Sequence, residues 1–193
     1  MPIENERKFV LNEQAVSLEA ELGAMQGVAR HLLRQAYLDA PGLRIRSLEG
    51  EGKTDHVFTY KRTIDGQVVE IETGLSAVDF GRLWTQRKET LVKVRYSWTD
   101  GAYHWDVDFF KRDDGSTYFA MAEVEMPEEQ SEPPPPPDFL ARHLLFVSPA
   151  LDPRFTSKRI ADQAHAARLL TEIRAKGSVS QSVVPSAAKG LAE

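Results

Sequence analysis

The sequence predicts an α+β fold, an antiparallel sheet of eight strands with flanking helices. Charged and apolar residues alternate along most of the expected strands, and successive side chains of a strand point to opposite faces. Each strand would therefore carry its charges on one face and its apolar residues on the other. Asp-Gly pairs between the segments are signals for two-residue hairpins, and a meander of this kind removes its exposed edges by closing into a barrel.

The strands are expected where the alternation runs between turn residues. They cover residues 2–10, 30–39, 42–49, 55–63, 67–74, 91–99, 103–112 and 117–126. Hairpin signals link the fourth strand to the fifth and separate the last three, at Asp65-Gly66, Asp100-Gly101 and Asp114-Gly115.

Helices are expected before the second strand and before the sixth. Residues 12–26 are rich in Glu and Ala, which predicts a helix, although Gly23 and Gly27 are poor helix formers. Ser76, with Asp79 three residues later, has the pattern of an N-cap ahead of an apolar helical face.

The last part of the chain has a different composition. The prolines at 133–137 predict an extended, stiff spacer after the last strand. Residues 157–174 carry apolar residues at helical spacing, which predicts a further helix. From Gly177 onward the residues are small and polar. We therefore expect residues 1–175 to form one domain and residues 176–193 to be a disordered tail.

Charges recur at positions two residues apart, mostly with one sign in each pair. The motifs are Glu4-x-Glu6-x-Lys8, Arg44-x-Arg46, Thr59-x-Lys61, Glu70-x-Glu72, Lys93-x-Arg95, Asp106-x-Asp108 and Glu123-x-Glu125. Two like charges at this spacing, about 6.6 Å, repel by about 2.5 kcal/mol at an effective dielectric constant of 20. A solvated face of the sheet explains any single pair. A surface that binds no ligand, however, would mix positive and negative residues. We therefore expect a ligand to neutralise each cluster.

Cationic and anionic clusters suit different parts of one ligand. Arg binds phosphate oxygens with a bidentate fork, and Lys binds them as a point charge. Carboxylates suit a hard divalent cation such as Mg²⁺, which usually binds one or two carboxylates together with substrate phosphates. The two kinds of cluster together predict a site for a metal ion and a polyphosphate.

The ordered series of motifs resembles the CYTH superfamily, the triphosphate tunnel metalloenzymes. The N-terminal motif is similar to the ExExK signature of that family, and the later pairs follow in the family's order over residues 2–172. The resemblance implies an eight-stranded antiparallel barrel whose charged faces line a tunnel. It also implies an enzyme with Mg²⁺ or Mn²⁺ as its cofactor.

The resemblance, together with charge and reach, assigns roles to the charged residues. The expected metal ligands are Glu4, Glu6, Asp108, Glu123 and Glu125. The expected phosphate-binding residues are Arg44, Arg46, Lys61, Lys93, Arg95 and Lys158. The alignment near Lys158 is loose, and Arg159 could take its place. Supporting roles, as anchors for the cations or as groups that orient water, fall to Glu70, Glu72 and Asp106, with a plain salt bridge as the alternative for each.

Lys8 and Tyr37 are the candidate catalytic pair. Residues 34–38, RQAYL, are similar to the Q-x-Y-L segment of bacterial members that cleave inorganic triphosphate, in which a Lys and a Tyr are thought to activate water. A Lys among other cations should have a lowered pKa, which would make Lys8 a usable base near neutral pH. The alternative is that Tyr37 only packs. The histidines show no metal spacing and are expected at surface or core positions, at His31, His56, His104, His143 and His165.

Composition narrows the possible partners. A net charge of −5 argues against non-specific nucleic-acid binding, and no apolar run reaches the ~20 residues of a membrane helix. The sequence has no Cys and no apolar leader, so we expect a cytoplasmic protein. The expected partner is a small-molecule polyphosphate, and a homodimer is compatible with the sequence.

The expected function is metal-dependent hydrolysis of the terminal phosphate of inorganic tripolyphosphate. Alternatives within the same fold are a nucleoside or thiamine triphosphatase and an adenylyl cyclase. The alternative from another class is a polyphosphate-binding module without catalysis.

Overall fold

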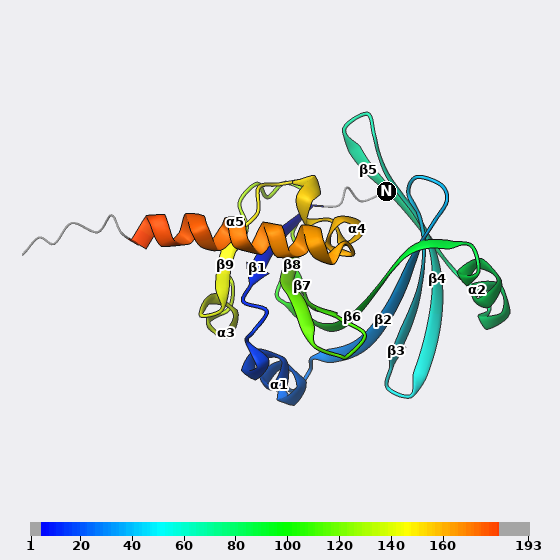
Figure 1. The fold of residues 1–193 in the computed structure, drawn as a ribbon, viewed down its shortest axis with the longest axis horizontal. Coiled ribbons are helices and arrows are strands. Elements are labelled where there is room, and N and C mark those ends of the chain that lie inside the picture. Colours follow the sequence, from blue (N-terminus) through cyan, green and yellow to red (C-terminus); the bar gives the residue numbers. More distant parts are fainter. Residues whose placement is uncertain (1–4, 182–193) are drawn as a thin grey trace, which may run out of the picture.

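The computed structural model describes residues 5–181 and shows a strongly curled antiparallel sheet surrounded by helices (Figure 1). The strands are β1 (Glu6–Leu11), β2 (Ala29–Leu38), β3 (Leu43–Gly50), β4 (Lys53–Ile64), β5 (Gln67–Gly74), β6 (Arg87–Asp100), β7 (Tyr103–Lys111), β8 (Thr117–Glu125) and β9 (Leu144–Val147). The helices are α1 (Val16–Ala24), α2 (Ala77–Trp84), α3 (Asp138–Ala141), the 3₁₀ helix η1 (Pro153–Phe155), α4 (Ser157–Ile160) and α5 (Gln163–Gln181).

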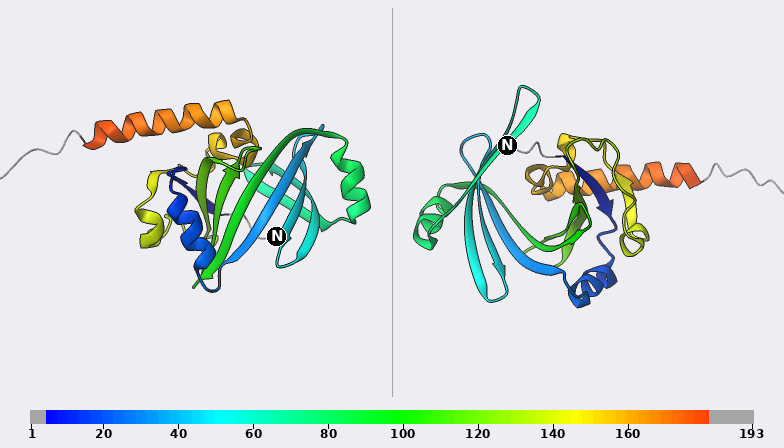
Figure 2. Two further views of the ribbon diagram at one scale, coloured as in Figure 1. Left: turned by 60° about the horizontal axis from the view of Figure 1, so that its bottom comes forward. Right: turned by 180° about the vertical axis from the view of Figure 1, so that it is seen from behind.

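The described strands form one sheet in the order β5-β4-β3-β2-β6-β7-β8-β1-β9. Two meanders, β2 to β5 and β6 to β8, are joined by the antiparallel pairing of β2 with β6, and β1 lies beside β8. β5 and β9 end the sheet, and no pairing among the described residues joins them. Figure 2 shows that the sheet curls like a barrel without closing.

The predicted antiparallel fold with flanking helices is confirmed, but two of its details are wrong. The sheet has a ninth strand, β9, and it is curled without being closed. β9 has only four residues, LLFV, too few to show an alternating pattern, and it pairs with β1, which is distant in sequence. Its pairing could not be foreseen from local signals.

The turn predicted at Asp65-Gly66 and the helix cap predicted at Ser76 are confirmed, whereas the chain turns at Gly101-Ala102 in place of Asp100-Gly101 and forms a longer loop around Asp114-Gly115. Asp65 and Gly66 have φ values of 51° and 79°, the left-handed conformation that a type I′ hairpin requires at both central positions. The Ser76 hydroxyl accepts a hydrogen bond from the Asp79 backbone N–H at 3.0 Å and starts α2. These signals depend only on neighbouring residues, which is why the sequence contains them.

The C-terminal helix differs from the prediction of one helix over residues 157–174. The backbone forms α4 and then α5, because the Asp162 side chain accepts hydrogen bonds from the backbone N–H groups of Ala164 and His165 and caps a new helix. α5 continues to Gln181, so the predicted tail is helical over residues 176–181. Residues 182–193 lie outside the described part of the chain. No helix in the described part is long and apolar enough to cross a membrane.

One hydrophobic core lies on the outer face of the sheet. There the fully buried Leu18 and Leu22 of α1 belong to one cluster with Phe9, Trp105 and other outward-facing residues of β1 and β6 to β8. The Phe9 and Trp105 ring centroids are 5.5 Å apart. This packing fixes one side of the sheet and leaves the charged face of the same strands turned inward.

A second core lies on the inner face, at one end of the curled sheet. The inward positions change from charged to apolar along each strand: Lys8 to Val10 on β1, Lys93 to Leu91 on β6, Asp108 to Phe110 on β7 and Glu123 to Met121 on β8. Phe155 and Ile160, from the segment after β9, pack onto these apolar positions together with α5. The C-terminal segment therefore fills one end of the inner space, and the charged residues line the rest.

We expect Phe155→Ala to lower the free energy of unfolding by about 3–5 kcal/mol, because the ring is fully buried and its loss leaves a cavity. Urea unfolding would measure the change. Leu151→Ala is the matched control in the same segment, since Leu151 is 68% exposed and its truncation should change stability by about 0.5 kcal/mol or less. Equal losses in both variants would contradict this account of the second core.

Candidate functional site

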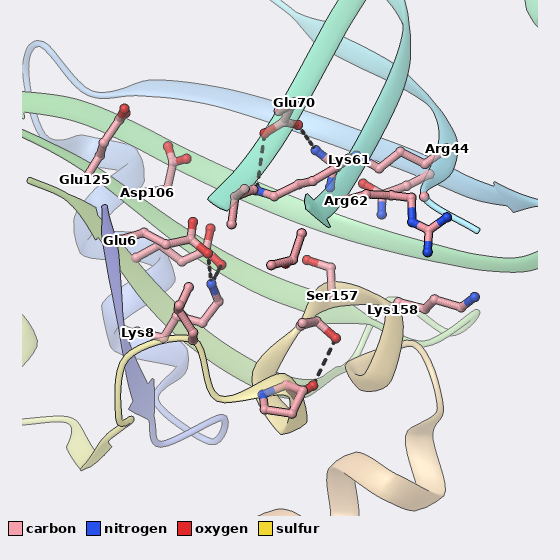
Figure 3. Close-up of a pocket in the computed structure, with 18 of the residues that line it drawn as sticks. Glu6, Lys8, Arg44, Lys61, Arg62, Glu70, Asp106, Glu125, Ser157 and Lys158 are labelled. Atoms are coloured by element: carbon pink, nitrogen blue, oxygen red, sulfur yellow. Dashed lines mark hydrogen bonds and ion pairs between the residues drawn. The ribbon is translucent and has the colours of Figure 1, made fainter. Parts of the chain in front are cut away.

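A cavity of about 850 Å³ opens on the charged part of the inner face. The sequence-predicted residues that line it are Glu6, Lys8, Tyr37, Arg44, Arg46, Lys61, Glu70, Glu72, Lys93, Arg95, Asp106, Glu123, Glu125 and Lys158. Figure 3 shows Glu6 and Lys8 of β1 on one side and Arg44 and Lys61 of β3 and β4 on the other. Residues from the whole length of the sheet therefore meet in one cavity. Glu4 lies outside the described residues.

Two arginines of β3 form ion pairs with two glutamates of β5. Arg44 Nη2 lies 2.5 Å from a carboxylate oxygen of Glu70 and 3.7 Å from one of Glu72, and Arg46 pairs with Glu72. Lys61 Nζ of β4, between them, is 3.2 Å from Glu70. The two glutamates therefore anchor the cations, which is one of the roles expected for them.

The same arginines keep unused hydrogen-bond donors. The Nε groups of Arg44 and Arg46 are buried and have no hydrogen-bond partner among the described residues. Burial and the neighbouring Arg44 lower the pKa of Arg46. Buried donors without partners are unfavourable, and so is a guanidinium beside another guanidinium. Both features favour binding of an anion at this wall.

Gly42, in the turn between β2 and β3, allows the backbone of this turn to approach β4 closely. Gly42 has a φ of 84°, and a Cβ atom there would lie 2.6 Å from the backbone oxygen of Lys61. The Gly42 carbonyl accepts a hydrogen bond from the Lys61 N–H at 2.9 Å. Only glycine permits both the left-handed backbone and this close approach, which places Lys61 beside the arginines.

A buried ion-pair network holds the cations of β6. Asp108 of β7 is fully buried, and its carboxylate accepts hydrogen bonds from Lys93 Nζ at 2.5 Å and from Arg95 Nη2 at 2.6 Å. Arg95 also pairs with Asp106, whose other carboxylate oxygen accepts a hydrogen bond from Ser97 at 2.5 Å. Burial lowers the pKa of Arg95, but Asp108, Asp106 and Glu123 together raise it more, so this guanidinium stays charged.

The prediction that Asp108 is a metal ligand is wrong on geometric grounds. Its carboxylate is fully buried, does not line the cavity and is used by two cations. Asp106, predicted to be a supporting residue, does line the cavity. Sequence spacing puts both residues on one face of β7 but does not reveal that the cavity ends between them.

Carboxylates gather on the opposite wall, where β1 pairs with β8. Glu6 stands directly opposite Glu125, and Lys8 stands opposite Glu123. Lys8 pairs with Glu6 and lies 3.4 Å from Glu123. Burial would raise the pKa of Glu123, but Lys8 and Arg95 hold it well below its usual range, so the group is ionised.

These carboxylates fit a divalent cation only in part. Glu6 and Glu125 are like charges on directly opposite positions, a destabilising arrangement that a cation would relieve. In the described part of the chain, no three acidic or His side chains are close enough to hold a metal ion by themselves. One or two carboxylates suffice for Mg²⁺ when phosphate oxygens and water complete its shell. The donors present therefore fit a metal that is bound together with a phosphate ligand.

The expectation that Lys8 has a lowered pKa is wrong. Burial lowers the pKa of Lys8, but Glu123 and Glu6 raise it more, and the net shift is upward. Lys93 shows the opposite behaviour: burial and the neighbouring Arg95 lower its pKa, against the effect of Asp108. The sequence places both lysines among charges, but only the structure shows which charges are their neighbours.

Tyr37 lies on the cavity wall of β2, directly opposite Arg44. Its hydroxyl oxygen accepts a hydrogen bond from Gln35 Nε2 at 2.6 Å, and Lys158 Nζ lies 5.6 Å from its ring centroid. Among the described residues no hydrogen bond joins Tyr37 to Lys8. Lys158 lines the cavity and Arg159 does not, which favours Lys158 as the cation that follows the last strands.

Several residues that line the cavity were not predicted from the sequence to belong to the site, among them Gln35, His104 and Ser148. Gln35 shares the inward face of β2 with Tyr37, so the alternation could have identified it. His104 stands opposite Glu125, and its Nε2 lies 3.4 Å from Asp106; its side chain is 45% exposed, so the expected surface position is confirmed, but the residue also lines the cavity. Ser148 follows β9, a strand that the sequence did not reveal.

A curled antiparallel sheet whose charged inner face lines a cavity defines the class of triphosphate tunnel folds. The family model described as the CYTH domain matches residues 2–155, and the chain belongs to the CYTH family. A comparison with curated proteins gives no match.

Three solved structures are similar to the chain. The inorganic triphosphatase NE1496 is 21% identical over 83% of this chain and 95% of that chain, with a TM-score of 0.49. The PH1819 protein from Pyrococcus horikoshii OT3 is 20% identical over 66% of this chain and 79% of that chain, with a TM-score of 0.49. A putative adenylate cyclase from Bacillus halodurans is 18% identical over 97% of this chain and 95% of that chain, with a TM-score of 0.41.

We expect Asp108→Asn to lower the free energy of unfolding by about 3–5 kcal/mol, because Lys93 and Arg95 would lose a buried counter-charge. Urea unfolding would measure the loss. Asp55→Asn is the control, since its pair with Lys53 is exposed and should be worth about 0–1 kcal/mol. A loss within that smaller range for Asp108→Asn would show that the network does not support the site.

Proposed function

We propose that this protein is a metal-dependent hydrolase that removes the terminal phosphate of inorganic tripolyphosphate. The observation that carries the proposal is the division of one cavity into a cationic wall and a carboxylate wall. In such a cavity the cationic wall would face the phosphate oxygens of a polyphosphate chain. The carboxylate wall would face the divalent cation that is bound to the chain.

The cationic wall would bind and orient the phosphate chain. Arg44 and Arg46 line the cavity, and their side chains stay 17% and 14% exposed although each is paired with a glutamate. Phosphoryl transfer needs little covalent chemistry from the protein, so fixed cations along the chain supply positioning and electrostatic stabilisation. Ion pairs to Glu70 and Glu72 hold the arginine side chains before a ligand binds, which lowers the cost of ordering them.

The carboxylate wall would hold Mg²⁺ or Mn²⁺ through the facing carboxylates of Glu6 and Glu125, with phosphate oxygens and water as the other ligands. When bound, the ion would neutralise charge that develops on the phosphoryl oxygens. Lys8 would stay protonated between Glu6 and Glu123, and it would contribute a positive charge at the edge of this wall.

Lys93 and Lys8 would both act as fixed cations beside the phosphate chain. Lys93 lines the cavity, and its ion pair with the buried Asp108 fixes the position of its side-chain nitrogen. Lys8, held by two carboxylates, is suited to the role of a fixed cation.

Phosphate release from tripolyphosphate, ATP and thiamine triphosphate, measured side by side with Mg²⁺ and with Mn²⁺, tests the proposal. Preferred release from tripolyphosphate would support it. Preference for a nucleoside or thiamine triphosphate would support an alternative enzyme of the same fold, and conversion of ATP to cyclic AMP would support a cyclase. Binding without turnover of any of these ligands would support a non-catalytic module.

We expect Glu6→Gln to abolish hydrolysis and to weaken Mn²⁺ binding by at least tenfold, while the protein remains folded. The variant removes one of two facing carboxylates, and Lys8 retains Glu123 as a partner. Calorimetric titration with Mn²⁺ in the presence of phosphate would measure the binding. Glu49→Gln, an exposed carboxylate on the outer face of β3, is the control. Activity within tenfold of the parent in Glu6→Gln would remove Glu6 from the metal site.

We expect Arg44→Ala and Arg46→Ala each to raise KM for tripolyphosphate and to lower kcat. A phosphate clamp binds the transition state more tightly than the ground state, because charge redistributes during transfer. Titration of tripolyphosphate in Ca²⁺, which should slow the reaction, would isolate binding. Arg34→Ala, on the exposed outer face of β2, should change neither quantity. Unchanged affinity in both cavity variants would place the arginines outside the clamp.

A further inference from the structure

Gln35 is a buried polar residue in the cavity wall that takes no part in the ion pairs. Its exposed fraction is 1%, although the residue lines the cavity. On one side it faces Arg46 of β3, and on the other it faces Leu91 of β6. A buried amide without a partner is costly, so the contacts of this side chain matter.

The amide of Gln35 makes a short hydrogen bond along its own strand. Its Nε2 donates to the Tyr37 hydroxyl oxygen at 2.6 Å, and both side chains point inward because the residues are two positions apart. Arg46 stands opposite Gln35 in the register, and a positive charge on that side favours an amide oxygen facing it and an NH₂ group facing Tyr37.

The Tyr37 ring is held from two further sides. Lys158 Nζ lies 5.6 Å from the ring centroid, and the ring packs against the second core. Burial raises the pKa of Tyr37 more than Arg44 and Gln35 lower it, so the phenol keeps its proton at neutral pH. A protonated phenol whose oxygen already accepts a hydrogen bond has its own O–H left to donate.

We propose that Gln35 is a positioning residue that holds the Tyr37 hydroxyl as a hydrogen-bond donor aimed into the cavity, for a phosphoryl oxygen of the bound chain. The inference rests on the proposed function, and it gives Tyr37 a role as hydrogen-bond donor to the substrate in place of its expected role, with Lys8, in activating water. No proton is transferred in this role. Tyr37 supplies a neutral donor beside the charged donors of Arg44 and Arg46.

This role predicts a specific pattern in a double-mutant cycle. Tyr37→Phe deletes the donor and should lower kcat on tripolyphosphate by about 10²-fold, as loss of one preorganised donor does in other enzymes. Gln35→Met keeps the volume but releases the hydroxyl, and it should lower kcat by about tenfold. The double variant should be no slower than Tyr37→Phe, because Gln35 acts only through the hydroxyl.

The control variant is Leu91→Met, which lies directly opposite Gln35 and is 4% exposed. It perturbs packing at the same place and should leave kcat unchanged. Affinity for tripolyphosphate in Ca²⁺ should change by less than threefold in Gln35→Met, since the fold and the cationic wall are kept. Additive losses in the double variant, or parent-like kcat in Gln35→Met, would overturn the proposal.

A measurement without catalysis separates this inference from the proposed function. The side-chain NH₂ resonances of Gln35, assigned from their absence in Gln35→Met, should shift in Tyr37→Phe and stay in place in Leu91→Met. Unshifted resonances in Tyr37→Phe would show that the hydrogen bond does not exist and would overturn the inference. Failure of the parent protein to hydrolyse tripolyphosphate would instead overturn the proposed function, and with it the phosphoryl oxygen as the acceptor.

Discussion

The buried carboxylate of Asp108 is the interaction on which the cavity depends. It binds both Lys93 and Arg95 at the boundary between the charged and the apolar part of the inner face. Without a counter-charge, two cations this deeply buried would be strongly unfavourable. Because Asp108 is itself fully buried and fully used, the charge that reaches the cavity from β6 is fixed in position and remains cationic.

The inner face of the sheet has an apolar end that packs into a hydrophobic core and a charged end that lines the cavity. At one end its apolar residues pack against Phe155, Ile160 and α5, and this packing stabilises a sheet whose outer strands do not pair with each other. At the other end the same alternation supplies charged groups. The two ends of this sheet do not pair, so other contacts have to connect its parts. One such contact comes from the segment after β9, which places Lys158 against the ring of Tyr37 on β2.

The sequence predicts most of the strands and turns because their signals are local. The alternation identified the cavity-lining charges, since a strand's inward positions are fixed by period two. Depth and neighbours are not local: Asp106 and Asp108 are equivalent in sequence, yet only one lines the cavity. Lys8 and Lys93 likewise lie in similar motifs, and their opposite pKa shifts arise from partners on other strands. The pairing of β2 with β6, which joins the two meanders, has no local signal either.

Ion pairs with glutamates hold Arg44 and Arg46 in place in the cationic wall. Glu70 and Glu72 occupy Nη2 groups of these arginines, and the buried Nε groups have no partner among the described residues. The two guanidinium groups are therefore fixed in position before an anion binds. The carboxylates that would repel an anion stand mainly on the opposite wall, where Glu6 faces Glu125. If the protein binds the proposed polyanion despite its net charge of −5, charge separation across the cavity matters more than total charge.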